Sequence, residues 1–395
     1  MPAEGVSPAA AAVRRRVSRR SIPSSSASSP VFAINVPFAV VGVAVALWQI
    51  PESRSPGRVP LDPVGAVVSV VGLVALVYGI IEEPSRGWAD PQIFGSLGLA
   101  AVVLAAFVWW ELHTDHPMLE MQLFRDPRFS AASLSVTLVY FGLMGALFLL
   151  TQYLQGVLGL SVLQTGFRFV AIAVGIMAGA AVAAALTARA GTRRATTLGL
   201  VATGLGMGLM TTLGLRTGDA QIAGILALAA AGMGLAITPA TDAIMASLPE
   251  AKFGVGSAVN DATREIGGAI GVAVLGSVFA GTYASTLAPA LTALPADAAK
   301  AARDSLAGAG AVAAAIGHAG VPLAGDSLVA AARNAFVEAM GPTAIAGAAV
   351  ALVGAVVAWT FLPDRADAPA PIERTAGAGG LDTGLGRAAQ PTSEA

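Results

Sequence analysis

The sequence predicts an all-α integral membrane protein, and three observations carry this prediction. Hydrophobic residues make up 55% of the 395 residues and charged residues 12%, whereas a soluble domain carries about 25% charged residues. Nine stretches of about twenty residues contain no Asp, Glu, Lys or Arg, and an apolar helix of this length crosses a bilayer. None of these stretches alternates between apolar and polar residues, as the strands of a membrane barrel do.

Nine membrane-spanning helices are therefore expected, one from each charge-free stretch. In chain order they are 31–50, 63–81, 93–110, 131–151, 169–187, 195–215, 220–241, 266–281 and 342–362. All five tryptophans lie near span ends or in a short loop, and aromatic side chains favour the membrane–water interface. Three later spans carry glycines four residues apart, which favours close helix packing. These pairs are Gly175/Gly179, Gly204/Gly208 and Gly267/Gly271.

Basic residues in the connections predict which ends of the spans face the cytoplasm. Alternate connections carry nine Lys and Arg residues, and the intervening ones carry Arg86, Arg168 and Arg216. Because cytoplasmic loops are enriched in Lys and Arg, the first set and the C-terminus are expected in the cytoplasm. That set is Arg54, Arg58, Arg125, Arg128, Arg189, Arg193, Arg194, Lys252 and Arg264.

The segments between and beyond the spans differ in composition. Residues 1–30 are rich in Arg and Ser and are predicted to be disordered. The predicted orientation puts them outside the cytoplasm, which conflicts with their five arginines because Arg-rich segments favour the cytoplasmic side. Residues 113–130 form a predicted cytoplasmic loop. The long connection 282–341 is an expected extracytoplasmic loop with short surface helices, and 363–395 is a predicted disordered cytoplasmic tail.

Several classes of function are excluded by what the sequence lacks. It has no cysteine, so thiolate chemistry is absent, and its net charge of −1 argues against a nucleic-acid partner. Neither lysine, Lys252 or Lys300, follows a glycine, so there is no P-loop for ATP. The pair His113 and His116 lacks the further ligands of a metal site. No catalytic constellation lies in any span, so an enzyme is not expected, and an intramembrane enzyme is the weakest alternative.

Five groups of short stretches follow one another in a recognisable order. They are Phe32–Pro37 with Pro51–Arg54 and Leu61–Asp62; His116–Leu119 with Leu123–Arg125 and Arg128–Phe129; Leu149–Gln155; Pro239–Met245; and Gly254–Asn260 continuing through Arg264 to Gly276. This series resembles the major facilitator superfamily, specifically its fourteen-span drug:proton antiporters of the EmrB/QacA type. The resemblance covers about residues 31–290.

The resemblance implies a major-facilitator-like helical bundle, in which two six-helix halves rock about a central cavity. The nine spans would match the family's sixth to fourteenth, with the first five absent. Residues 131–362 would then form the complete C-terminal half, and 31–112 the last helix of the other half plus two linker helices. Residues 1–30 match nothing in the family, so we interpret them as a misassigned start or a frameshift upstream of Val31. A partial copy of the superfamily's loop motif, Ala188–Arg194, lacks its acidic residue.

Proton coupling requires a carboxylate that can lose and regain its proton in a partly buried site. Three carboxylates near span ends are candidates, namely Asp242, Asp261 and Glu265. Arg264 and Asn260 share a helix face at a spacing of four residues and would support them. The competing interpretation is a charged helix entrance that anchors the span at the membrane interface.

Two glutamines end the fourth predicted span near its outer face. Gln152 and Gln155 are candidates for substrate contact, and simple hydrogen bonding at the interface is the alternative.

The functional hypothesis is a multidrug efflux transporter of the inner or plasma membrane that exchanges protons for amphipathic drugs. No cofactor is expected, and the proton gradient would supply the energy. The expected partners are small amphipathic molecules, protons, the lipid bilayer and either a missing N-terminal half or an envelope protein. The alternative is a transport-inactive fragment or a membrane scaffold that needs a partner chain, because half of a rocking pair gives a cavity one wall.

Overall fold

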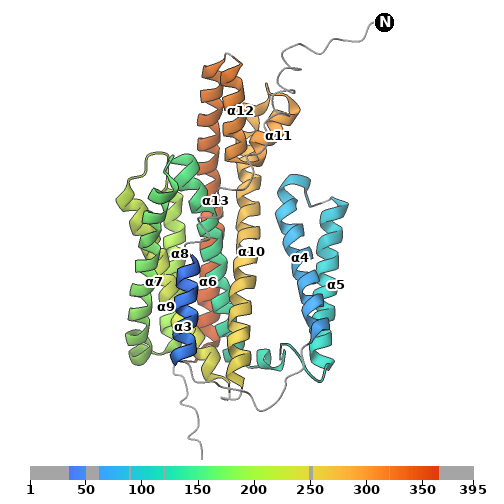
Figure 1. Ribbon diagram of the computed structural model, residues 1–395, viewed down its shortest axis with the longest axis vertical. Coiled ribbons are helices and arrows are strands. Elements are labelled where there is room, and N and C mark those ends of the chain that lie inside the picture. Colours follow the sequence, from blue (N-terminus) through green and yellow to red (C-terminus); the bar gives the residue numbers. More distant parts are fainter. Residues whose placement is uncertain are drawn as a thin grey trace, which may run out of the picture. The chain divides into compact units, whose positions relative to one another are not determined.

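The computed structural model describes residues 35–49, 62–88, 90–119, 121–248, 252–319 and 321–363. All regular structure within these ranges is helical (Figure 1). The predicted disordered segments 1–30 and 363–395 lie outside the described residues, apart from Pro363. The chain divides into two units, Met1–Pro60 and Leu61–Ala395.

The described helices follow one another as a series of long elements separated by short turns. They are α3 (Asn35–Gln49), α4 (Pro63–Arg86), α5 (Pro91–His113), η1 (Met121–Arg125), α6 (Pro127–Gln152), η2 (Tyr153–Val157), α7 (Val162–Ala190), α8 (Thr192–Leu209), η3 (Met210–Thr212), α9 (Asp219–Ala246), α10 (Phe253–Leu287), η5 (Ala288–Leu291), α11 (Ala296–Asp304), α12 (Leu306–His318) and α13 (Pro322–Phe361).

Eight of these helices are long and apolar enough to cross a membrane, namely α4 to α10 and α13. They confirm the last eight of the nine predicted spans. The described part of the first predicted span, 31–50, is α3, whose 15 residues are fewer than the twenty or so that a crossing needs. Whether this segment spans the membrane therefore stays a prediction.

Aspartate followed by proline starts three of the spans. The side chains of Asp62, Asp90 and Asp126 each accept a hydrogen bond from a backbone N–H in the first turn of the helix that follows. The proline fits the first helical position because its missing N–H would have had no partner there. These short signals fix where α4, α5 and α6 begin.

Helices α6 to α10 and α13 form a six-helix bundle that is held together by close contacts at glycines (Figure 1). A Cβ on Gly179 of α7 would overlap the carbonyl oxygen of Ala231 on α9, and a Cβ on Gly271 of α10 would overlap that of Phe141 on α6. Small residues allow the two helix backbones to come this close. In a membrane the hydrophobic effect does not hold helices together, so such close van der Waals packing stabilises the bundle instead. Of the predicted glycine pairs, two lie at such contacts, but a Cβ on Gly208 would meet no described atom within 4 Å.

The packing of the bundle repeats in two sets of three helices. Helix α7 packs on α9 much as α10 packs on α6, and α8 packs on α9 as α13 packs on α6. The two sets, α6–α8 and α9, α10 and α13, therefore have equivalent neighbours, as expected of an inverted repeat.

The turn between α7 and α8 is bound to the end of α13. Gly191 has a φ of 87°, which glycine adopts without strain, so α8 begins directly after α7 ends. The Arg193 guanidinium donates through Nε to the carbonyl of Leu362 at 2.8 Å and lies over the ring of Trp359. A cation at a helix C-terminus also interacts favourably with the helix dipole. Within the partial loop motif Ala188–Arg194, Arg193 thus joins two helix ends.

Arg193→Ala is expected to lower the free energy of unfolding by roughly 1–3 kcal/mol, because it removes a charge-assisted hydrogen bond and a ring contact. Unfolding in a titration with a denaturing detergent measures this. Arg194, the exposed neighbour, provides the matched control, and Arg194→Ala should change stability by less than about 0.5 kcal/mol. Equal losses in the two variants would contradict the assigned role of Arg193.

The last two spans extend well beyond the stretches predicted for them. Helix α13 has 40 residues and is therefore about 60 Å long, twice the thickness of the hydrocarbon core. Its first part packs beside α12 (Figure 1), and the hydroxyl of Tyr283 on α10 donates to the carbonyl of Ala302 on α11 at 3.2 Å. Helices α11 and α12 thus pack on the projecting ends of α10 and α13. Which side of the membrane they occupy stays a prediction.

Candidate functional site

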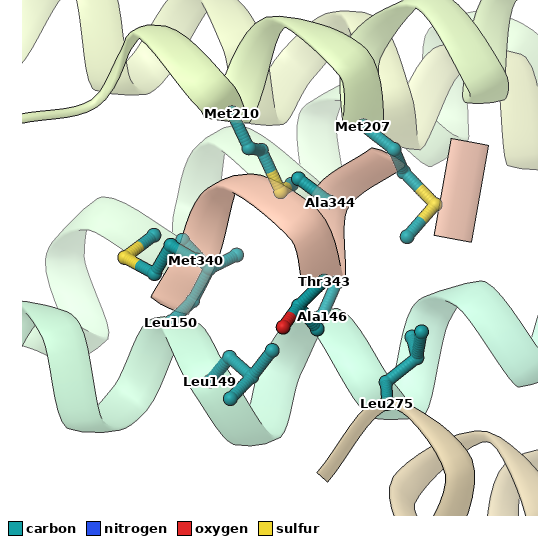
Figure 2. A pocket seen from close by; sticks show the side chains of 9 residues that line it. All are labelled: Ala146, Leu149, Leu150, Met207, Met210, Leu275, Met340, Thr343 and Ala344. Atoms are coloured by element: carbon teal, nitrogen blue, oxygen red, sulfur yellow. The ribbon is translucent and has the colours of Figure 1, made fainter. Parts of the chain in front are cut away.

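The six-helix bundle encloses a small apolar cavity between α6, α8, α10 and α13 (Figure 2). Its lining is made of aliphatic side chains, three methionines and one threonine, namely Ala146, Leu149, Leu150, Met207, Met210, Leu275, Met340, Thr343 and Ala344. The one side-chain oxygen, that of Thr343, donates to the carbonyl of Ala339 in its own helix at 2.8 Å. The cavity therefore offers an incoming molecule mainly apolar and thioether surface.

The cavity is too small for a drug-sized molecule in this conformation. Its volume is about 20 Å³, room for about one water molecule, whereas pockets for small-molecule ligands measure about 300–1,000 Å³. A second cavity of about 20 Å³ adjoins it and shares Ala146, Leu150 and Met210 with it. Binding of a larger molecule here would require the helices or the methionine side chains to move.

Polar residues gather around the first turns of α10. Asn260 is buried, and its Oδ1 accepts a long hydrogen bond of 3.5 Å from Thr241 on α9. The Arg264 guanidinium lies 5.4 Å from the ring centroid of Tyr140 on α6 and 3.9 Å from the carboxylate of Asp261. Its Nε is buried and has no hydrogen-bond partner among the described residues. Three helices therefore meet at this polar cluster.

The three carboxylates predicted to couple protons differ in their contacts. Asp261 is paired with Arg264, whereas Asp242 and Glu265 are exposed and take part in no hydrogen bond or ion pair within the described residues. The prediction put Asp261 and Glu265 ahead of the span, but both lie inside α10, which begins at Phe253. Among the described contacts, Arg264 therefore pairs with Asp261 and not with Asp242 or Glu265, and the proton-coupling roles remain predictions.

Gln152 and Gln155 lie at an irregular turn on the opposite end of α6. Gln152 is the last residue of α6, and Gln155 belongs to η2, a π-helical turn. Such turns are frequent at functional sites. Both side chains are half-buried, and the neighbouring Tyr153 is fixed by a hydrogen bond to the carbonyl of Gly214 at 2.7 Å. A role of either glutamine in substrate contact remains a prediction.

Sequence reasoning missed two polar contacts between helices. The aromatic ring of Tyr140 faces Arg264 from 124 positions earlier in the chain, and Glu83 on α4 accepts a hydrogen bond of 3.0 Å from Ser277 on α10. The second contact ties the α4–α5 hairpin to the bundle. Neither has a local sequence signal, because the partners come from separate helices.

Comparison with known proteins assigns the family. The sequence model described as Major Facilitator Superfamily matches residues 24–272, more than half of the chain. The chain belongs to the Major Facilitator Superfamily. It is thus a multi-pass membrane protein of a transporter family and not of an enzyme family, and its six-helix bundle with repeated packing is the fold expected for one half of such a transporter.

Several relatives carry names that refer to drug resistance or export. Multidrug resistance protein Stp of Mycobacterium tuberculosis is 33% identical over 66% of this chain and 48% of its own length. Multidrug efflux pump LfrA of Mycolicibacterium smegmatis is 34% identical over 83% of this chain and 64% of its own length. The tetracenomycin C resistance and export protein of Streptomyces glaucescens is 30% identical over 63% and 47%. The chain spans about half the length of most of these curated relatives.

Proposed function

We propose that this chain is part of a drug exporter that moves amphipathic molecules out of the cell. The names of Stp, LfrA and the tetracenomycin C exporter refer to drug resistance, efflux or export, which supports drugs as the transported molecules. We further propose the fourteen-span, proton-coupled type, located in the cell membrane with its C-terminus in the cytoplasm. The spans would be the sixth to fourteenth of that type.

The observation that carries the proposal is the methionine-lined apolar cavity inside the bundle (Figure 2). Methionine is unbranched and polarizable, so its side chain adapts to ligands of different shape. Proteins that bind many partners use such surfaces because they can repack around each one. A wall of this kind favours binding by hydrophobicity and approximate shape, which suits export of varied amphipathic drugs.

Proton coupling is proposed for the polar cluster at the start of α10 and the nearby end of α9. Asp242 is a carboxylate within a candidate membrane span and has no partner among the described residues. Ionisable groups in such positions are costly and commonly serve transport. In this account Asp242 takes up and releases the coupled proton, Asp261, Glu265 and Arg264 set the local charge, and Asn260 offers a hydrogen-bonding amide.

A second candidate function is that of an inactive fragment or a scaffold that needs a partner chain. Alternating access requires two halves that rock against each other, and one complete half is found among the described residues.

Drug tolerance of cells that lack their own exporters separates these functions. The 395 residues are produced alone, and together with the first half of a relative such as LfrA. The exporter proposal predicts raised tolerance to several unrelated amphipathic drugs when both halves are present. Unchanged tolerance in both cases, with both polypeptides found in the membrane, would instead support the inactive fragment or scaffold.

A further inference from the structure

Two carboxylates meet where the α4–α5 hairpin begins and ends. Asp62 caps the start of α4, where its Oδ1 accepts from the backbone N–H of Gly65 at 2.8 Å. Its Oδ2 accepts from the indole Nε1 of Trp110 on α5 at 2.9 Å. The next residue on α5, Glu111, uses Oε2 to accept from the backbone N–H of Leu119 at 2.9 Å.

The other oxygen of Glu111 faces Asp62 and has no partner among the described residues. Glu111 is 3% exposed, and its Oε1 is buried without a hydrogen bond. This Oε1 and the Oδ2 of Asp62 lie 2.5 Å and 2.6 Å from the point where a Cβ on Gly65 would be. The two oxygens are therefore within about 5 Å of each other, a separation at which like charges interact strongly in a buried site. The absence of a side chain on Gly65 leaves the space between them open.

Two ionised carboxylates at this separation repel each other, and a buried charge that has no partner is costly. A metal ion such as Mg²⁺ or Ca²⁺ would need about six oxygen ligands. No group of three or more His, Cys, Asp and Glu residues suitable for a metal occurs in the described part of the chain. A single proton needs one donor oxygen and one acceptor oxygen, which this pair provides.

We propose that Glu111 and Asp62 share one proton, so that the α4–α5 hairpin carries a proton-binding site separate from the polar cluster at α10. In this arrangement the protonated Oε1 of Glu111 donates toward the Asp62 carboxylate. The proposal does not depend on drug transport, because the site is defined by contacts within the hairpin and the turn that follows it.

Among the described residues of α4, α5 and η1, Asp62 is the charged group that faces Glu111. On α4, Glu82, Glu83 and Arg86 lie at the far end of the helix. On η1, Arg125 is exposed and forms no ion pair with Glu111 among the described contacts. The groups on α5 and its following turn are exposed as well, namely His113, Asp115 and His116.

The shared proton would stabilise the connection between the hairpin and the bundle. Through Asp62 and Trp110 it joins the start of α4 to the end of α5, and through Leu119 it holds the turn that leads to η1 and α6. The folded chain would hold this proton more tightly than the unfolded chain does. Its stability should therefore be greatest at low pH and fall as the pH rises through the release of the proton.

Infrared spectroscopy of the purified full chain tests the proposal directly. At neutral pH the wild-type chain should show the C=O stretching band of a protonated carboxylic acid. Glu111→Gln should remove this band, and the exposed control Glu338→Gln should retain it. The absence of the band from the wild type, or its persistence in Glu111→Gln, would overturn the proposal.

Two further measurements distinguish a shared proton from a merely structural glutamate. Asp62→Asn keeps a residue that caps the helix equally well but removes the negative charge beside Glu111. Glu111 should then bind its proton about tenfold more weakly, so the infrared band should be half lost at a lower pH than in the wild type. In the Glu111→Gln variant the side-chain amide can donate to Asp62 as protonated Glu111 does. The stability of this variant should therefore no longer fall as the pH rises. An unchanged midpoint, or equal pH dependence of stability in Glu111→Gln and the wild type, would overturn the sharing.

Discussion

Gly179→Ala is expected to destabilise the six-helix bundle, although alanine is the better helix former. A Cβ at this position would overlap the carbonyl oxygen of Ala231, and its next neighbours are the carbonyl carbon of Ala231 and the backbone nitrogen of Leu235. Because all of these atoms belong to the backbone of α9, no rotamer change can relieve the overlap. The helices must separate instead, and overpacking of this kind costs about 1–3 kcal/mol.

The matched control is Gly224 on α9, the helix that Gly179 contacts. A Cβ there would meet no described atom within 4 Å, so Gly224→Ala should be neutral, or stabilising by up to about 1 kcal/mol through helix propensity. Unfolding in a detergent titration measures both variants. The packing account predicts a loss of stability in Gly179→Ala and none in Gly224→Ala, and a loss shared equally by the two variants would contradict it.

Asp242→Asn is expected to lower proton-driven drug export by about tenfold or more, in an exporter that contains both halves. The substitution keeps the size of the side chain but removes its ability to exchange a proton. Asp242 lies near the end of α9 within a candidate span, and no described residue forms an ion pair with it. An ionisable side chain within a membrane span is energetically unfavourable, and such residues commonly have a role in transport.

The control for Asp242 is a carboxylate outside the spans. Asp297 lies exposed in the first turn of α11, so Asp297→Asn should leave export unchanged. The amount of each variant in the membrane is measured in parallel. Full proton-driven export by Asp242→Asn would exclude this residue from coupling and shift attention to Asp261 or Glu265.

The spans could be predicted from the sequence because membrane burial excludes charge over a fixed length. This criterion located eight helices, but it misjudged the start of α10. Its first turns carry Asp261, Arg264 and Glu265, so a charge-free stretch begins only after them. The charged turns remain helical because their backbone N–H and C=O groups continue the hydrogen bonds of the helix beyond the apolar stretch.

The sites were less predictable, because they depend on contacts between distant helices. The contact of Arg264 with Tyr140, and the approach of Glu111 to Asp62, join residues from separate helices. The glycine spacing shows the same limit. Gly175/Gly179 and Gly204/Gly208 have equal spacing, yet Gly179 meets the backbone of another helix and Gly208 does not. Spacing identifies a helix face, and the fold decides what lies against it.

The uptake of a fluorescent amphipathic dye into inverted membrane vesicles tests the central claim most directly. The vesicles contain this chain together with the first half of a relative such as LfrA, and a proton gradient is imposed across them. The account predicts dye uptake that requires both halves and stops when a protonophore removes the gradient. No gradient-driven uptake, with both polypeptides inserted in the membrane, would contradict a proton-coupled exporter.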